Sequence, residues 1–138
     1  MAVTGKVYLV GGGPGDPGLV TVKGVAVLRL ADVVLYDFLV HPSLLRYCAQ
    51  ADKICVGKKK GYHSKRQDEI NALMCRFALE GKCVVRLKGG DPAIFGRIGE
   101  ELQVLRRHNI AYEVVPGVSS ASAVPMYMGI PLTHRHLS

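Results

Sequence analysis

The sequence contains no tryptophan, few aromatic residues and few acids, and these absences narrow the classes of protein it can belong to. Aromatic residues form 7% of the chain, and no zinc-finger, helix-turn-helix or RNP-like pattern accompanies its basic residues. The 11 acidic residues are outnumbered by 18 Lys and Arg, which gives a formal charge of +7 that attracts anionic partners. A small polyanionic substrate accounts for this charge as well as nucleic acid does, and we expect no nucleic-acid partner.

Long apolar runs and paired cysteines are missing too. No run approaches the roughly 18 apolar residues needed to span a bilayer, and the N-terminus lacks a charged segment followed by an apolar core. These absences predict a cytoplasmic protein without a membrane partner. The cysteines form no Cys-x-x-Cys pair, so they favour reduced, buried thiols over a disulfide framework, a redox motif or a zinc site; they are Cys48, Cys55, Cys75 and Cys83.

The sequence does contain a regular alternation of strand and helix patterns. A chain of 138 residues with 49% hydrophobic content suits one domain with its own core. Short apolar, β-favouring runs predict strands over 6–10, 33–36, 53–56, 82–87 and 112–115. Helices are predicted between them over about 21–30 and 43–49, between Ser64 and Gly81, and over about 97–108, with a last helix from about 119. The alternation predicts an α/β fold: a three-layer α/β/α arrangement with a mainly parallel five-stranded sheet, whose ligands bind at the carboxyl ends of the strands.

Capping signals and apolar faces define the helices further. Thr21 is the expected N-cap of the first helix, and Ser64 with Gln67 forms a capping-box pattern for the third. Gly81 is placed to end that helix. One face of it gathers Ile70, Leu73, Met74, Phe77 and Ala78. The helix over 97–108 is expected to bury Ile98, Leu102 and Leu105.

The first glycine-rich loop follows the first predicted strand. Its Gly13-x-Gly15-x-x-Gly18 pattern matches the dinucleotide fingerprint, and Asp37 stands where a ribose-binding acid is expected. Pro14 and Pro17, however, remove N–H donors that a pyrophosphate needs, and the helix starts too late to point at a phosphate. The loop therefore favours a ligand without phosphates, such as a sulfonium-bearing adenosine.

A second glycine-rich loop, Gly89-Gly90-Asp91-Pro92, follows the fourth predicted strand. Its glycines allow the backbone to approach a ligand closely, and Asp91 could accept hydrogen bonds from a ribose or an amine or face a positive sulfonium. The alternative is an ordinary tight turn. His134 and His136 lie two residues apart, but no nearby acid or thiol completes a metal site, and we expect no metal.

Several segments together resemble the uroporphyrinogen-III C-methyltransferases of the tetrapyrrole methylase family. The resemblance follows the chain in order over nearly its whole length, and the run from Arg86 to Arg97 is its most specific part. The matching segments are 11–18, 36–40, 56–58, 85–97, 115–122 and 129–135. This sequence departs from the family pattern at Ile98, at Ser119-Ser120 and in the loop after Lys58.

The resemblance implies a two-domain enzyme in which S-adenosylmethionine lies between two α/β domains. Residues 1–138 match the N-terminal domain, so the family's C-terminal domain is expected to be absent from this chain. By position, the cofactor-binding residues are Pro14, Gly89, Gly90, Asp91, Ile94, Ser119 and Ser120. Asp37 matches the proposed base, with a capping or salt-bridged aspartate as the alternative, and Lys58 matches the proposed acid.

The activity that the resemblance implies is methylation of uroporphyrinogen III at C2 and C7, giving precorrin-2 for sirohaem or cobalamin. The substrate's carboxylates suggest Arg86, Arg97 and Arg135 as substrate-binding residues. Two alternatives stay open: a non-catalytic module that binds a tetrapyrrole or nucleotide, and a related precorrin methyltransferase. We expect the isolated chain to be inactive and to self-associate, as a homodimer.

Overall fold

A computed structural model describes residues 4–57 and 66–137 of the chain. It contains a sheet of five strands in the order β3-β2-β4-β1-β5, in which every neighbouring pair is parallel. The predicted five-stranded parallel sheet is therefore confirmed. The strands are β1 (Lys6–Gly11), β2 (Val33–Tyr36), β3 (Asp52–Cys55), β4 (Cys83–Lys88) and β5 (Ala111–Val115).

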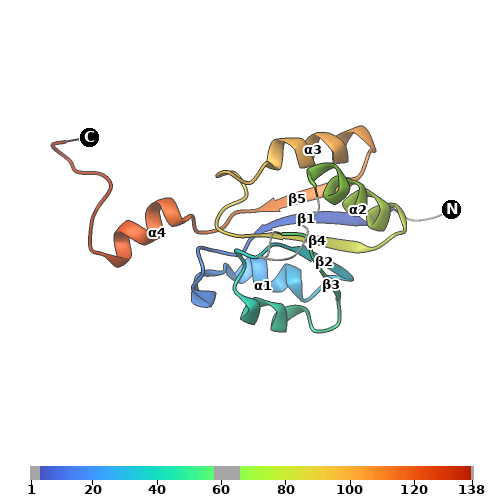
Figure 1. The fold of residues 1–138 in the computed structure, drawn as a ribbon, viewed down its shortest axis with the longest axis horizontal. Coiled ribbons are helices and arrows are strands. Elements are labelled where there is room, and N and C mark those ends of the chain that lie inside the picture. The colour runs from blue at the N-terminus through green and yellow to red at the C-terminus, as the bar shows by residue number, and fades with distance from the viewer. Residues whose placement is uncertain (1–3, 58–65, 138) are drawn as a thin grey trace.

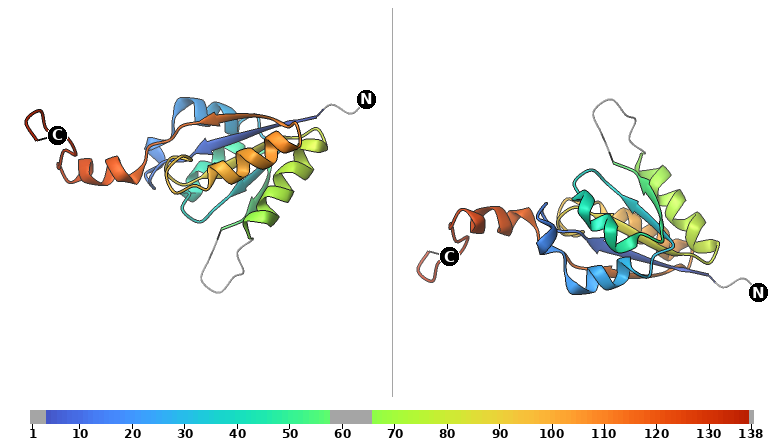
Figure 2. Two further views of the ribbon diagram at one scale, coloured as in Figure 1. Left: turned by 90° about the horizontal axis from the view of Figure 1, so that it is seen from above. Right: turned by 90° about the horizontal axis from the view of Figure 1, so that it is seen from below.

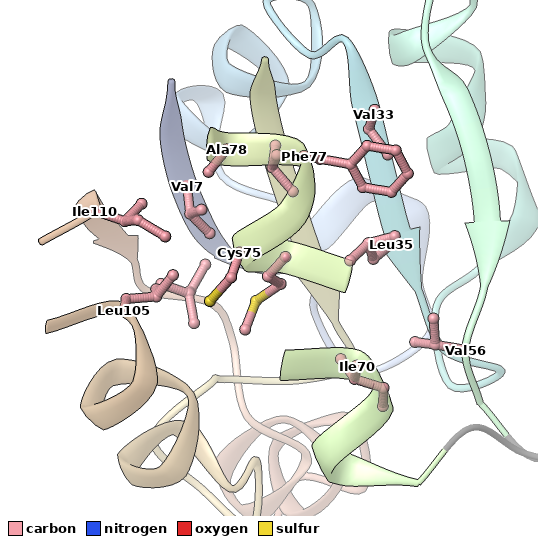
Figure 3. Packing of buried hydrophobic residues seen from close by; sticks show 13 residues of the cluster. Val7, Val33, Leu35, Val56, Ile70, Cys75, Phe77, Ala78, Leu105 and Ile110 are labelled. Atoms are coloured by element: carbon pink, nitrogen blue, oxygen red, sulfur yellow. The ribbon is translucent and has the colours of Figure 1, made fainter. Parts of the chain in front are cut away.

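Helices cover both faces of this sheet, which confirms the three-layer architecture. Helix α1 (Val22–Leu28) and the 3₁₀ helix η2 (Pro42–Cys48) lie on one face, and α2 (Gln67–Leu79) and α3 (Ile98–Arg107) lie on the other (Figure 1). Each helical layer encloses its own apolar core against the sheet. In the core beneath α2 and α3, Phe77 and Ile70 of α2 pack towards Leu35 of β2 (Figure 3).

The predicted helix ends are partly correct. Thr21 caps α1, since its hydroxyl accepts a hydrogen bond from the Gly24 amide at 2.9 Å, but the helix ends at Leu28 rather than at residue 30. The segment expected as a helix over 43–49 is a 3₁₀ helix that starts at Pro42. Ser64 lies outside the described residues, and α2 begins after Arg66, whose side chain makes no capping bond.

Helix α3 corrects the predicted core. Leu105 is buried as expected, whereas Ile98 and Leu102 are only partly buried. Glu101 is as fully buried on this helix as Leu105. On α2, Leu73 is partly buried and the other predicted apolar positions are buried. A charged residue thus takes a core position that the apolar pattern alone assigns to its neighbours.

The chain leaves the three-layer body after β5. Helix α4 (Ser120–Tyr127) extends away from the sheet, and the last described residues continue beyond it (Figure 2). The Tyr127 hydroxyl donates to the Asp16 carboxylate at 2.7 Å, which ties α4 to the loop after β1. This hydrogen bond lowers the pKa of Asp16 and raises that of Tyr127. Most apolar side chains from Val124 onwards are exposed.

Two neighbouring strands send the chain to opposite faces of the sheet. Strand β1 leads into α1 and strand β4 leads towards α3, which cover different faces (Figure 1). Since β1 and β4 are paired, this is a topological switch point, where open α/β sheets leave a crevice at the carboxyl ends of their strands. The fold therefore places both glycine loops at one crevice.

Two further sequence expectations bear on the whole described chain. Across residues 4–57 and 66–137, none of the helices combines the length and apolar character needed to cross a bilayer. All of the cysteines are free thiols; Cys48 and Cys75 are buried, and Cys55 and Cys83 are half-buried. Burial raises the thiol pKa of Cys48, Cys75 and Cys83, which makes these groups poor nucleophiles.

Candidate active site

A cleft of about 410 Å³ opens where the chain leaves β1, β2 and β4. Its volume is within the range of small-molecule sites. Most residues selected from the sequence line it: Pro14, Asp37, Arg86, Gly89, Gly90, Asp91, Ile94, Arg97, Ser119 and Ser120. Arg135 does not line the cleft but lies exposed in the segment after α4, and Lys58 lies outside the described residues.

The two glycine loops meet along their backbones and form one wall of the cleft. The Gly90 amide donates to the Gly13 carbonyl at 2.7 Å, and the Gly13 amide donates to the Gly90 carbonyl at 3.2 Å. A Cβ atom at Gly117 would lie 2.3 Å from the Gly90 carbonyl oxygen, so the loop after β5 also packs at backbone distance. Glycine is required here because no side chain fits between these segments.

Gly90 differs from its neighbours because the space beside it is open. Its φ of +65° lies in the left-handed region, and a Cβ atom there would have the Val118 carbonyl, at 4.0 Å, as its nearest contact. The cleft also includes Pro14, which has no N–H, so this wall presents few amide donors. Such a wall suits a ligand that approaches the backbone closely and carries no phosphate.

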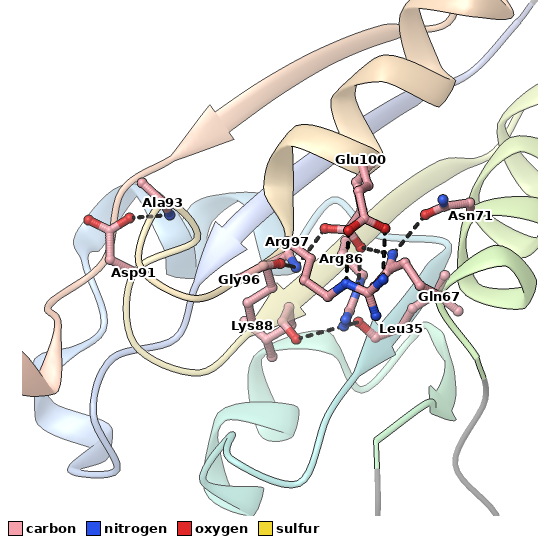
Figure 4. Close-up of polar contacts among 12 residues, drawn as sticks. Leu35, Gln67, Asn71, Arg86, Lys88, Asp91, Ala93, Gly96, Arg97 and Glu100 are labelled. Carbon is pink, nitrogen blue, oxygen red and sulfur yellow. Dashed lines mark hydrogen bonds and ion pairs between the residues drawn. The ribbon is translucent and has the colours of Figure 1, made fainter.

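Polar side chains border this wall from two loops. Asp91 accepts a hydrogen bond from the Ala93 amide at 3.0 Å through Oδ1, and the Ser119 hydroxyl accepts one from the Ala121 amide at 3.2 Å as the N-cap of α4. The tight-turn alternative for Asp91 is therefore present in the structure (Figure 4). It is compatible with a ligand contact, because each group keeps a further acceptor site.

Asp37 follows the last residue of β2 and faces the cleft. Its Oδ1 accepts a hydrogen bond from the Leu39 amide at 2.9 Å, so one oxygen stabilises the turn that follows the strand. Within the described residues, Oδ2 accepts no hydrogen bond, which leaves one oxygen available to a ligand. This bond closes a turn rather than capping a helix, because the next helix, η2, has His41 as its N-cap. The role of Asp37 as a base stays a prediction.

Arg86, Lys88 and Glu101 form a buried charge cluster. Arg86 and Lys88 also line the cleft (Figure 4). The Glu101 carboxylate pairs with Arg86 Nε at 2.9 Å and with Lys88 Nζ at 2.6 Å. Lys88 Nζ also donates to the Gly96 carbonyl. Burial lowers the pKa of the Lys88 ammonium, and the charge of Glu101 opposes that shift.

Lys88 and Glu101 are not among the predicted site residues, although the sequence contains a signal for them. Strand β4 reads Cys83-Val84-Val85-Arg86-Leu87-Lys88, and two cations in an apolar central strand require a buried counter-charge. Arg86 uses Nε for Glu101 and Nη1 for the carbonyls of Leu35 and Leu87, at 3.4 Å each. Its guanidinium is therefore largely engaged within the protein, and its contact with a substrate stays a prediction.

The rim of the cleft is formed by a loop, residues 91–97, with an unusual backbone. Phe95 and Arg97 have φ values of +54° and +53°, which cost non-glycine residues of order 1–3 kcal/mol each. The Phe95 side chain is fully exposed. Arg97 pairs with Glu100 through two contacts, of 3.0 and 2.9 Å, and stays half exposed at the rim.

Comparisons with known proteins identify a family and a shared fold. The family model described as Tetrapyrrole (Corrin/Porphyrin) Methylases matches residues 6–138. The chain is 57% identical over 137 residues to a uroporphyrinogen-III C-methyltransferase of Methanocaldococcus jannaschii and 58% identical over 135 residues to a siroheme synthase of Photorhabdus laumondii. A crystal structure of uroporphyrin-III C-methyl transferase from Thermus thermophilus complexed with S-adenyl homocysteine superposes with a TM-score of 0.81 at 51% identity.

The matches cover this chain almost completely but cover the relatives only in part. Between 97% and 99% of the chain is aligned in these comparisons. The chain spans 57% of the archaeal relative, 29% of the siroheme synthase and 56% of the Thermus structure. It is therefore similar to about half of a complete methyltransferase.

Proposed function

This chain belongs to the tetrapyrrole (corrin/porphyrin) methylase family, and we propose that it forms the N-terminal half of a uroporphyrinogen-III C-methyltransferase that uses S-adenosylmethionine. The observation that carries the proposal is the convergence of both glycine loops, Asp37 and Ser119-Ser120 on one cleft. The chain's 57% identity to an enzyme of that name supports it. The C-terminal domain expected from the family resemblance would supply the other wall of the site.

The residues present fit S-adenosylmethionine in chemistry and shape. The cofactor has no phosphates, and the wall built from Gly13, Pro14 and Gly90 presents little to bind one. The open side of Gly90 allows close approach of a flat or extended ligand, while Asp91 and Ser119 offer oxygens to ribose hydroxyls or an amine. S-adenosylmethionine supplies an electrophilic methyl group when bound.

The protein's own contribution is mainly positioning and proton removal. In the complete enzyme, walls on both sides of the cleft would hold the pyrrole carbon in line with the methyl group and exclude water, which would accelerate the displacement without a stronger nucleophile. The displacement would form a carbon–carbon bond and break the carbon–sulfur bond. The methylated carbon bears a carboxylate side chain and no hydrogen, so the proton is lost elsewhere on the macrocycle, from a ring nitrogen or a neighbouring methylene bridge. Asp37 is the proposed acceptor of that proton, through the oxygen that the Leu39 amide does not occupy. Lys58 is the proposed acid.

Positive charge at the cleft suits a substrate rich in carboxylates. Arg97 at the rim keeps its guanidinium half exposed, and the buried charge cluster carries one more cation than anion. Arg86 and Arg135 complete the proposed substrate-binding set. We place the product, precorrin-2, in sirohaem or cobalamin biosynthesis, and the enzyme in the cytoplasm. We also propose that the protein forms a homodimer, and the exposed apolar side chains of α4 support this association.

The test uses the complete enzyme, meaning this chain joined to the proposed C-terminal half or to that of the archaeal relative. Labelled methyl groups from S-adenosylmethionine are expected on uroporphyrinogen III, two per molecule, by mass spectrometry under anaerobic conditions. Transfer only to already methylated precorrins would instead identify a related precorrin methyltransferase. Cofactor or tetrapyrrole binding without any transfer would support the non-catalytic module.

A further inference from the structure

The buried charge cluster connects three elements around the cleft. Lys88 is the last residue of β4, Glu101 lies in α3, and Gly96 lies near the end of the loop 91–97. Lys88 Nζ contacts Glu101 Oε1 at 2.6 Å and donates to the Gly96 carbonyl (Figure 4). A single ammonium group therefore joins the strand, the helix and the rim loop.

The loop 91–97 needs such a tie because its backbone is strained. Phe95 and Arg97, on either side of Gly96, both have left-handed φ values. Conformations of this kind persist only where the surrounding structure enforces them. Gly96 itself packs tightly, since a Cβ atom there would lie 2.3 Å from the Pro92 carbonyl oxygen. The hydrogen bond from Lys88 holds the loop at the centre of this strain.

Glu101 keeps Lys88 in place. A buried ammonium is costly unless an opposite charge and hydrogen-bond acceptors surround it, and Glu101 is fully buried beside it. The same carboxylate pairs with Arg86, whose own position is fixed by backbone carbonyls of β2 and β4. Without Glu101, two buried cations would face each other, and Lys88 would lose the partner that directs it towards Gly96.

We propose that Lys88 and Glu101 are positioning residues for cofactor binding: Glu101 orients Lys88, and Lys88 holds the loop 91–97 in the conformation that presents Asp91 and Ile94 to the cofactor. Neither side chain needs to touch the cofactor for this purpose. The inference rests on the proposed function for the identity of the cofactor, but its account of the loop can be tested without any turnover.

The test compares Lys88→Met, Glu101→Gln and the double variant in the complete enzyme. Calorimetric affinity for S-adenosylhomocysteine is expected to fall by about tenfold or more in each single variant, because a buried charge is removed or left without its partner. The KM for S-adenosylmethionine should rise in parallel, with kcat changed far less. Native-state hydrogen exchange at residues 94–98 should become faster, while exchange in β5 stays unchanged.

Glu113→Gln is the matched control. Glu113 also lies between two cations, Lys23 at 3.1 Å and Lys6 at 3.8 Å, but this group is partly exposed on β5. Its substitution should leave cofactor affinity within about twofold of the parent value, because exposed ion pairs contribute little. An equal loss of affinity in Glu113→Gln would show a general effect of charge and overturn the proposal.

The double variant tests whether Glu101 acts through Lys88. It removes one charge of each sign, so its loss of affinity should be no larger than that of Lys88→Met and smaller than the product of the two single effects. If one of the single variants fails to fold, cofactor affinity and hydrogen exchange are measured on the double variant instead. Unchanged affinity together with unchanged exchange at residues 94–98 would overturn the proposal. If the parent enzyme binds no S-adenosylhomocysteine, the proposed function fails. The exchange data still decide whether Lys88 and Glu101 hold the loop 91–97 in place.

Discussion

At the scale of single residues, Asp37 combines a structural role with the proposed chemical one. Oδ1 accepts the Leu39 amide, and Oδ2 is available at the cleft within the described part of the chain. Substitution by Asn keeps an oxygen for the amide but removes the carboxylate, whereas Ala removes both. The two variants therefore separate the stability of the turn from proton removal.

We predict that Asp37→Asn and Asp37→Ala both lower kcat of the complete enzyme by roughly 10²- to 10⁴-fold, as loss of a general base does. Calorimetry should show that both retain affinity for S-adenosylmethionine. Near-normal turnover in Asp37→Asn, with a defect confined to Asp37→Ala, would assign Asp37 to the turn alone.

Gly90 permits a similar separation of backbone strain from ligand contact. We predict that Gly90→Val abolishes detectable binding of S-adenosylmethionine, because its side chain would occupy the open space at the wall of the cleft. The control is Gly129→Val, since Gly129 has a φ of +71° against +65° for Gly90, and its surroundings are equally open. Both variants should lose about 1–2 kcal/mol of stability in urea unfolding, because valine disfavours this conformation.

Only Gly90→Val should affect binding in that comparison. Equal loss of binding in Gly129→Val would attribute the effect to strain, and normal binding by Gly90→Val would remove this loop from the site.

The burial of Glu101 could not be predicted from the sequence. The apolar pattern of α3 predicts burial of Ile98, Leu102 and Leu105. It does not predict burial of Glu101, because acidic residues on helices are usually solvated. The pairing of Glu101 with Arg86 and Lys88 joins residues from two separate elements. A sequence pattern indicates that buried cations need an acid, but it does not say which acid the fold brings to them.

At the scale of elements, α3 contains a glycine without evident need for one. Gly99 lies in the first turn, and a Cβ atom there would meet no atom within 4 Å. We predict that Gly99→Ala raises the free energy of unfolding by about 0.5–1 kcal/mol, because alanine loses less conformational entropy in a helix. Urea denaturation of this chain measures the change.

The matched substitution is Gly24→Ala in α1. A Cβ atom at Gly24 would lie 3.1 Å from the hydroxyl of Thr21 and 3.2 Å from a methyl carbon of Val20, so it would disturb the N-cap of its own helix. We expect no gain in stability there. A gain of equal size at both positions would show that local packing does not limit helix propensity in this domain.

The elements themselves were largely predictable, because the strand patterns are short apolar runs and the helix signals are local. Thr21 caps α1 and Gly81 follows α2 with a φ of +87°, as their sequence context indicates. The 3₁₀ geometry of η2 was not predictable, because α and 3₁₀ turns share similar residues over such a short segment. Its identity depends on packing beneath the sheet.

At the scale of the whole molecule, the proposed two-domain enzyme would place only one wall of its cleft in this chain. We predict that residues 1–138 fold alone, with a cooperative unfolding transition, but bind S-adenosylmethionine weakly and show no methyl transfer. One wall leaves a ligand partly solvated and lets water reach the reacting atoms. Calorimetric titration of the chain, repeated after the C-terminal half is added as a separate polypeptide, measures the difference.

Restored binding and turnover on addition of that half would support a site shared between two domains. Micromolar affinity and turnover by the chain alone would contradict the prediction and show that the described cleft is sufficient.

The overall architecture followed from the alternation of strands and helices, but the order of the strands did not. Nothing local in Val7 or Val84 indicates that β1 and β4 are neighbours, which the register of the sheet shows. The convergence of the glycine loops depends on that pairing. The resemblance named most of the residues that line the cleft, while their arrangement required the fold.

The strand order also has a consequence during synthesis on the ribosome. Strand β1 is made first, yet its partners are β4 and β5, and β2 also needs β4 on one side. Until Lys88 has emerged, only β2 and β3 can pair as they do in the final sheet. Because such distant pairings are slow to form, the apolar residues of β1 stay available to chaperones at least until β4 has been made.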